Sequence, residues 1–461
     1  MLRVGFSEVN ITPPPGLRMS GMLQPPRAEG VEWPLHARTV VFNDGIDQTA
    51  IVSLDLLFLS APTVAEFREA ITAGTGLDPA GVMMACSHTH RGPFTTSLMD
   101  EDANFEYLDR LRAQLVEGMA RALATSRPAR LKVGHIKAPG WTFNRRPVYR
   151  GEQVGTQGPA WGDHFVRLEG PADDDLQVLL VEDVHGGVLG GLVDFACHTT
   201  VMGGEPVYSA DFPGPLTDEL AQRLGDIFAY LQGASGNLWA HDLTRQTPRF
   251  ASGREHAQQM AQALADKACE ALATGRYLDD VTVRTRRVLL QIPQRRPTRE
   301  QVELARWYLE QAPPDVDQKE FTRRMYGHDY TFYNNDPAVQ SWFAREAIGM
   351  WEWQRRMGTR EARESVEIQA IAIGDAAFVG YPVELFCEFG LSTKERSPFA
   401  DTFVVTLANG WHGYVPTQEA FAHGGYEPRL GYQSRLVPEA GDYMRDAAVK
   451  LLCGLARPSS S

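Results

Sequence analysis

Short apolar segments that alternate with amphipathic helical stretches constrain the fold of this chain most. Residues 50–58 and 82–85 are apolar runs of strand length, and turn-forming or polar residues bound them. Residues 64–71 and 105–123 instead place apolar side chains every three or four positions, which is typical of a helix with one buried face. The alternation predicts an α/β protein in which helices pack on β-sheet.

The chain is expected to form one compact unit with a helical insertion. Its 461 residues are 43% hydrophobic and 22% charged, a globular composition long enough for a large core. Residues 177–181 and 188–196 predict a β-hairpin, and the stretch of about 298–362 is the most helical part. Because no linker-like segment interrupts the sequence, we expect a single domain over 1–456 and a tail at 457–461.

Charge and cysteine usage narrow the classes of partner and the compartment. The net charge is −13 and no long basic run occurs, so nucleic acid and anionic membrane surfaces are not expected partners. No apolar run approaches the roughly 20 residues of a membrane span, and the N-terminus lacks the apolar core of a signal peptide. The five cysteines are scattered without paired spacing. These features favour a cytoplasmic protein that acts on a small molecule; homo-oligomerisation stays open.

The segment Cys86–Pro93 carries the strongest chemical signal. Residues 82–85 are a short apolar strand, and two histidines, an arginine and then Gly92-Pro93 follow at once. In an extended chain His88 and His90 point to the same face. Two such imidazoles can bind one metal ion, or one can bind metal while the other transfers protons. The alternative is a pair of histidines that simply complete the end of a strand.

Two later segments place further polar side chains near strand ends. Residues 194–200 repeat the first pattern, since an apolar strand is followed by Cys197 and then His198. The loop 141–147 places Arg145 and Arg146 beside an asparagine and two aromatic residues. From this loop alone, a solvated basic turn is an equally good interpretation.

Taken in chain order, these segments resemble the catalytic domain of neutral, non-lysosomal ceramidases and their bacterial relatives. A lone His-Thr-His would be weak evidence, but the matching pieces span the chain in the order of that family. They are Ile11-Thr12-Pro13-Pro14, His88-Thr89-His90-x-Gly92-Pro93, Asn144-Arg145, His198-Thr199, Ser209-Ala210-Asp211-Phe212-Pro213-Gly214, Gly236-Asn237, Pro382-x-Glu384, Asn409-x-x-x-x-Tyr414 and Gly425-Tyr426-Glu427.

The resemblance implies mixed β-sheets flanked by helices and one zinc ion per chain. The matching zinc ligands are His88, His198, Glu384 and Tyr414, although Tyr414 can also be a phenol that lies beside the metal without binding it. His90 and Arg145 match the groups around the oxyanion that develops during catalysis. The implied reaction is hydrolysis of an amide (N-acyl) bond by attack of zinc-bound water.

Three departures from the family imply a substrate other than ceramide. Trp239 stands where ceramidases carry a serine that is essential for ceramide, and Arg91 replaces the small residue after His-Thr-His. The sequence also stops where the C-terminal immunoglobulin-like domain of the family would begin. We therefore expect Arg91, Trp239, Trp411 and Asn237 to contact a soluble, anionic substrate, with Arg91 gripping a carboxylate or phosphate.

Other functions fit part of the sequence. A metal-dependent esterase or lactonase would use the same metal site on a different carbonyl. A serine hydrolase is disfavoured because the sequence contains no Gly-x-Ser-x-Gly elbow. A non-catalytic binding protein that keeps a zinc pocket is the alternative from a different class.

Overall fold

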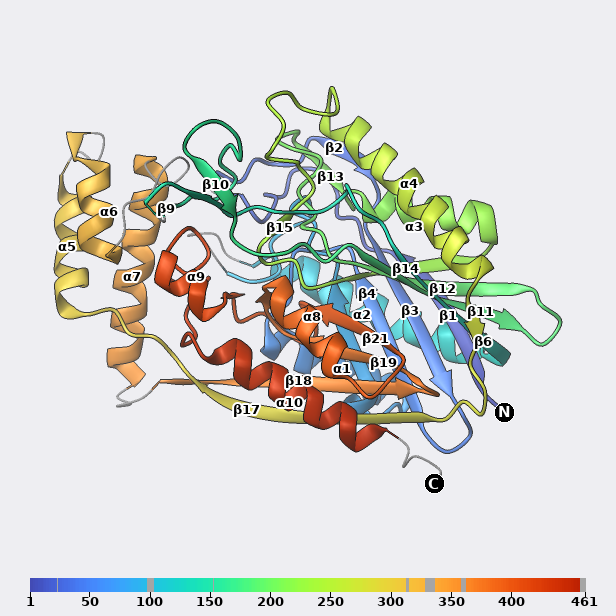
Figure 1. Ribbon diagram of the computed structural model, residues 1–461. Helices are drawn as coiled ribbons and strands as arrows, with labels where there is room; N and C mark the ends of the chain where they lie inside the picture. The colour runs from blue at the N-terminus through green and yellow to red at the C-terminus, as the bar shows by residue number, and fades with distance from the viewer. Residues whose placement is uncertain are drawn as a thin grey trace.

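Two β-sheets form the centre of the molecule, and helices cover the outer face of each (Figure 1). A computed structural model describes residues 1–22, 24–97, 103–151, 153–311, 315–327, 336–357 and 362–456. The expected tail at 457–461 lies outside the described residues. The predicted mixture of helices with parallel and antiparallel strands is confirmed.

The larger sheet has nine strands in the order β14-β12-β11-β6-β1-β3-β4-β5, with β16 paired to β6. Their bounds are β1 Arg3–Asn10, β3 His36–Asn43, β4 Gln48–Leu54, β5 Val82–Cys86, β6 Arg127–Lys137, β11 Asp175–Asp183, β12 Val188–Phe195, β14 Ile227–Gln232 and β16 Arg276–Tyr277. The expected hairpin is present as the antiparallel pair β11–β12. Parallel pairing of β4 with β5, and of β12 with β14, brings the carboxyl ends of these strands to shared edges.

The second sheet has four strands in the order β17-β18-β19-β21. Their bounds are β17 Val283–Pro293, β18 Arg363–Ile373, β19 Ala376–Tyr381 and β21 Asp401–Thr406. Short strands pair outside the two large sheets: β2 Gly30–Trp33 with β13 Val207–Ser209, β7 Phe143–Asn144 with β15 Leu238–Trp239, β8 Pro147–Tyr149 with β9 Gln153–Val154 and β10 Phe165–Leu168, and β20 Glu384–Leu385 with β22 Tyr414–Val415. The last pair joins two of the expected metal ligands.

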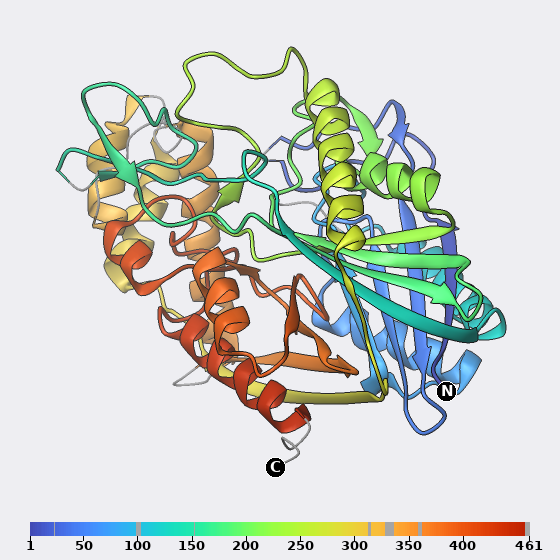
Figure 2. The same cartoon turned by 45° about the vertical axis from the view of Figure 1, so that its right-hand side comes forward.

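Most helices form two layers that cover the sheets, and one further group of helices stands at one end of the molecule. Figure 2 shows this arrangement from a second side. Their bounds are α1 Ala61–Thr75, α2 Phe105–Ala124, α3 Pro213–Leu224, α4 Gly253–Ala273, α5 Arg299–Glu310, α6 Gln318–Tyr326, α7 Pro337–Met357, α8 Cys387–Arg396, α9 Gln418–His423 and α10 Ala440–Leu455, with a single 3₁₀ turn η1 at Pro79–Gly81. In both views α5, α6 and α7 stand together at one end of the molecule, within the stretch expected to form a helical insertion.

The protein has four layers, helix, sheet, sheet and helix, and buried apolar side chains fill the cores between them. One face of the larger sheet packs against the smaller sheet, through side chains such as Met83 and Phe378. The opposite face of the larger sheet packs against α1 and α2, and further along against α3 and α4. Helices α8 and α10 cover the outer face of the smaller sheet. Alternate residues of each central strand therefore enter different cores, as the pleat requires.

The strand expected at 50–58 ends at Leu54, and the next residues leave the sheet. The Asp55 carboxylate accepts hydrogen bonds from the His36 amide at 2.9 Å and from Arg38 at 3.0 Å. This acid, which the expected strand included, therefore lies in a loop where its charge is paired. The carbonyl oxygens of Leu56 and Leu57 then accept hydrogen bonds from the backbone and the ring of His88. The shortened strand thus provides the support for the first histidine.

Among the described residues, no helix combines the length and the apolar character that a membrane crossing requires. The cytoplasmic location and the homo-oligomeric state stay predictions.

Candidate metal centre and active site

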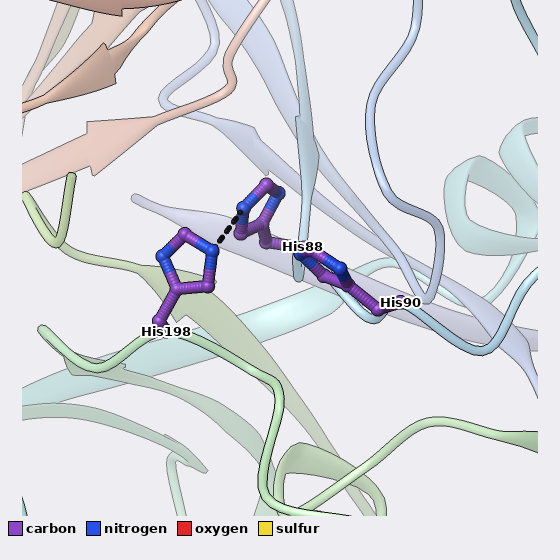
Figure 3. Close-up of side chains that lie close together, drawn as sticks. All are labelled: His88, His90 and His198. Atoms are coloured by element: carbon purple, nitrogen blue, oxygen red, sulfur yellow. Dashed lines mark hydrogen bonds between the residues drawn. The ribbon is translucent and has the colours of Figure 1, made fainter. Parts of the chain in front are cut away.

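Three histidines converge where β5 and β12 end. His88 and His90 follow β5, His198 follows β12, and their nearest ring nitrogens all lie within 4.8 Å of one another (Figure 3). Nε2 of His88 is 3.1 Å from Nε2 of His198. His88 has a φ of 67°, a left-handed conformation that is unusual outside glycine, so the loop holds this side chain in place at some cost. The three histidines therefore form a preformed cluster that can hold a metal ion.

The hydrogen bonds of the three rings fix which nitrogen carries a lone pair. The carbonyl oxygens of Leu57, Ser235 and Gly21 lie 3.1, 3.4 and 2.8 Å from the Nδ1 atoms of His88, His198 and His90, respectively. A carbonyl oxygen can only accept, so in a neutral ring Nδ1 carries the proton and Nε2 presents a lone pair. Two lone pairs that face each other at 3.1 Å repel unless a proton or a metal ion lies between them.

Burial keeps two of these imidazoles uncharged. Burial, together with the neighbouring His88, lowers the pKa of His90 to about 3. Burial also holds the pKa of His198 well below its usual range, with added repulsion from Arg145 and the other two rings. Neutral imidazoles keep their lone pairs at neutral pH, which is the form that binds metal.

Glu384, in β20, provides a carboxylate beside the histidines. Its Oε2 lies 3.3 Å from Nε2 of His88, and its Oε1 accepts a hydrogen bond of 2.9 Å from the indole of Trp411. Burial alone would raise the pKa of Glu384, but His88, Trp411 and the Tyr414 hydroxyl together lower it to about 2. The carboxylate is thus ionised and oriented by two neighbours.

Arg145 and Tyr414 form the wall next to this carboxylate. Nη2 of Arg145 donates to the Tyr414 hydroxyl at 3.2 Å and to the Gly236 carbonyl at 2.8 Å, while Nε donates to Glu427 at 2.9 Å. Burial and the charge of Glu384 raise the pKa of Tyr414 well above its usual range, against the effect of Arg145. A neutral phenol here donates to Glu384 and accepts from Arg145.

The solvated basic turn considered for this loop is excluded. Arg145 is 3% exposed and Arg146 is fully buried. The Arg146 guanidinium bonds Glu427 at 2.5 Å and also pairs with Glu169. Glu427 therefore holds both arginines. The sequence resemblance included Glu427 but did not predict this role.

A cavity of about 340 Å³, which we call the metal pocket, opens above these groups. Its lining includes His90, Arg91, Arg145, His198, Trp239 and Tyr414. A second cavity of about 750 Å³, the outer chamber, shares Trp239, Gln157 and Gly203 with it and is otherwise lined mainly by residues 240–253. The indole of Trp239, bonded to the Thr200 hydroxyl at 3.0 Å, stands between the two cavities.

Two of the residues expected to contact substrate lie behind the pocket in the described structure. The Trp411 ring stacks on Phe58 at 4.2 Å between ring centroids and supports Glu384. Asn237 is fully buried, where it donates to Glu388 at 2.8 Å and accepts from the Cys387 amide at 2.9 Å. Asn237 fixes the start of α8. Arg91 and Trp239 line the pocket, and their contact with a substrate stays a prediction.

The donor set fits a zinc ion. Imidazole nitrogens and a carboxylate are ligand types that zinc prefers, and the histidine rings and Glu384 are each held by a second hydrogen bond. The buried Nε2 of His90 has no hydrogen-bond partner among the described residues, so it is free for a metal, a water or a substrate.

Comparison with solved structures identifies the fold. A neutral ceramidase from Pseudomonas aeruginosa matches with a TM-score of 0.72 and 19% sequence identity over 98% of this chain and 74% of that chain. A ceramidase complexed with C2 also matches with a TM-score of 0.72, at 17% identity over 98% of this chain and 75% of the other. No protein-family model and no curated protein sequence matches. The chain thus has a neutral ceramidase-like fold with a strongly diverged sequence.

Proposed function

We propose that this chain is a zinc-dependent hydrolase that cleaves an amide (N-acyl) bond of a small molecule other than ceramide. The observation that carries the proposal is the group of three imidazoles beside Glu384, of which His90 and His198 line the metal pocket. The ceramidase-like fold supports the choice of an amide bond, because the two matching structures are ceramidases.

The ligands that we propose are His88, His198, Glu384 and Tyr414. His88 lies within 3.3 Å of both His198 and Glu384, and Tyr414 bonds Glu384. Zinc in this position would make a water acidic enough to attack at neutral pH and would polarise the scissile carbonyl.

We assign proton transfer to His90 and charge stabilisation to Arg145. Because Nδ1 of His90 donates to the Gly21 carbonyl, its Nε2 can accept a proton from the attacking water and return it to the leaving nitrogen. Arg145 keeps Nη1 without a hydrogen bond among the described residues while Nε and Nη2 anchor it. A fixed cation in this place stabilises the oxyanion more than the ground state.

The lining of the metal pocket supports catalysis without a side-chain nucleophile. Within the described structure no serine or cysteine lines this pocket, and its two threonines are engaged: Thr200 accepts from the Trp239 indole and Thr156 donates to Glu427. The sequence resemblance places Trp239 where ceramidases carry their serine. Ser235 is buried and its hydroxyl accepts a hydrogen bond of 2.7 Å from Gln232. Trp239 also narrows the entrance, which disfavours a two-chain lipid.

The test combines metal analysis with a substrate screen. We expect about one zinc per purified chain, hydrolysis of N-acyl compounds that a chelator abolishes and zinc restores, and little hydrolysis of ceramide. If the protein cleaves esters or lactones but no amides, the proposed amide hydrolase is wrong and the protein is a metal-dependent esterase or lactonase. Bound zinc with no turnover of either class would indicate a binding protein.

A further inference from the structure

Arg91 is a buried cation in the wall of the metal pocket. It follows His90 directly, is 2% exposed, and is held by its backbone, whose amide bonds the Thr89 hydroxyl and whose carbonyl accepts from the Ser209 amide. Its position is therefore fixed by the same loop that carries the histidines.

The guanidinium of Arg91 is not satisfied by the protein. Nη1 and Nη2 are both buried and have no hydrogen-bond partner among the described residues. The adjacent cations differ, since Arg145 and Arg146 both bond the carboxylate of Glu427. A buried guanidinium cannot deprotonate, so its donors need an acceptor from outside the chain.

The negative charges that act on Arg91 do not supply this acceptor. Asp211 and Glu205 raise the pKa of Arg91 against the larger effect of burial, which lowers it. The Asp211 carboxylate also lines the pocket, but it accepts the backbone amides of Val201, Met202 and Phe212. The fixed Asp211 carboxylate in the pocket wall favours a monoanionic ligand over a doubly charged phosphate.

We infer that Arg91 selects the substrate by binding its carboxylate through Nη1 and Nη2, so that the substrate class is N-acyl compounds with a free carboxylate, such as N-acyl amino acids. A planar carboxylate matches the fork of two parallel guanidinium donors. The inference rests on the proposed function for the bond that is cleaved, but the binding of the carboxylate can be measured without cleavage.

The test uses two probes that the enzyme cannot hydrolyse, 4-phenylbutyrate and 4-phenylbutan-1-ol, titrated into the zinc-loaded protein in a calorimeter. The wild type should bind the acid roughly 10-fold or more tightly than the alcohol, as expected for charged hydrogen bonds. In Arg91→Met this ratio should fall to about 1 while the alcohol binds as before, and Arg91→Lys should give a smaller ratio than the wild type.

Arg245→Met is the matched control, since Arg245 is an exposed arginine of the outer chamber. It should keep the wild-type ratio. The inference is overturned if the wild type does not prefer the acid, if Arg91→Met keeps the preference because the carboxylate binds the metal, or if only Arg245→Met loses it. If Arg91→Met does not fold, comparison of the wild-type and Arg91→Lys ratios still tests whether Arg91 binds the carboxylate. A preserved ratio in a protein that hydrolyses no amide would overturn the proposed function alone.

Discussion

The metal pocket and the outer chamber are built on different principles, although they share the wall formed by Trp239. In the metal pocket, each proposed ligand or catalytic side chain follows or lies within a strand and is held by a second hydrogen bond, as Leu57 holds His88 and Trp411 holds Glu384. These groups come from segments far apart in the sequence. Strand pairing and these second hydrogen bonds therefore fix the positions of the groups.

The outer chamber is formed mainly by one stretch of irregular chain, residues 240–252, together with the start of α4. Its rings pack on one another: between ring centroids, His256 stacks on Phe250 at 4.2 Å and meets His241 edge to face at 5.0 Å. Such stacking tolerates small shifts that a metal ligand does not. On the proposed function, we expect the metal pocket to hold the scissile bond and the carboxylate of the substrate, and the outer chamber to accept its acyl group.

The largest effect is expected from removing a histidine of the metal pocket. His198→Ala should lower zinc affinity by more than the roughly 10- to 100-fold that follows a change beside a ligand. His241→Ala removes a histidine of the outer chamber and should keep the wild-type zinc content. Mass spectrometry of metal after dialysis provides the measurement. Wild-type zinc affinity in His198→Ala would show that the ligand assignment is wrong.

The next effect should fall on catalysis without loss of metal. Arg145→Met should lower kcat by roughly 10²- to 10³-fold, as for the loss of one oxyanion donor, with unchanged zinc content. Arg146→Met is the neighbouring control, because this side chain bonds Glu427 and Glu169 away from the pocket. It should lower Tm and change kcat much less. If the two variants lose kcat equally, Arg145 has a structural role alone.

A smaller effect should separate a metal ligand from its support. Trp411→Phe keeps a ring that can stack on Phe58 but removes the indole N–H that bonds Glu384. Zinc affinity should fall by roughly 10- to 100-fold, and the fold should persist because the ring is retained. Competition with a zinc chelator measures the change. Wild-type affinity in Trp411→Phe would mean that Glu384 does not depend on this bond.

The sequence predicted the parts of the site that depend on local pattern. His88, His90 and His198 come shortly after apolar strands, which places them near one sheet edge. The extended chain assumed for His88 and His90 is not observed, because His88 has a left-handed φ of 67°. Glu384 and Tyr414 came from the resemblance, because nothing in their neighbourhood shows that β20 and β22 pair as parallel strands. The support that Trp411 gives to Glu384 was not predicted, since sequence does not show which side of a ligand a ring faces. Gly21 was missed for the same reason, because its contact with His90 joins segments 69 residues apart.

The smallest effect, and the sharpest test of the comparison, is expected at the wall that both cavities share. Trp239→Ala removes the indole that stands between them and its hydrogen bond to Thr200. For a substrate with an aromatic acyl group we expect KM to rise by roughly 3- to 10-fold, the value of one lost aromatic contact, with zinc content and kcat near those of the wild type.

A matched acetyl substrate, which is too small to reach the outer chamber, should show little change in KM. Trp239→Phe keeps a ring and should restore most of the aromatic preference, although it lacks the donor to Thr200. A fall in kcat for both substrates would mean that Trp239 supports the reaction in the metal pocket and does not act mainly on the acyl group. An equal rise in KM for both would show that the outer chamber does not distinguish acyl groups, and the division of tasks between the two cavities would then be wrong.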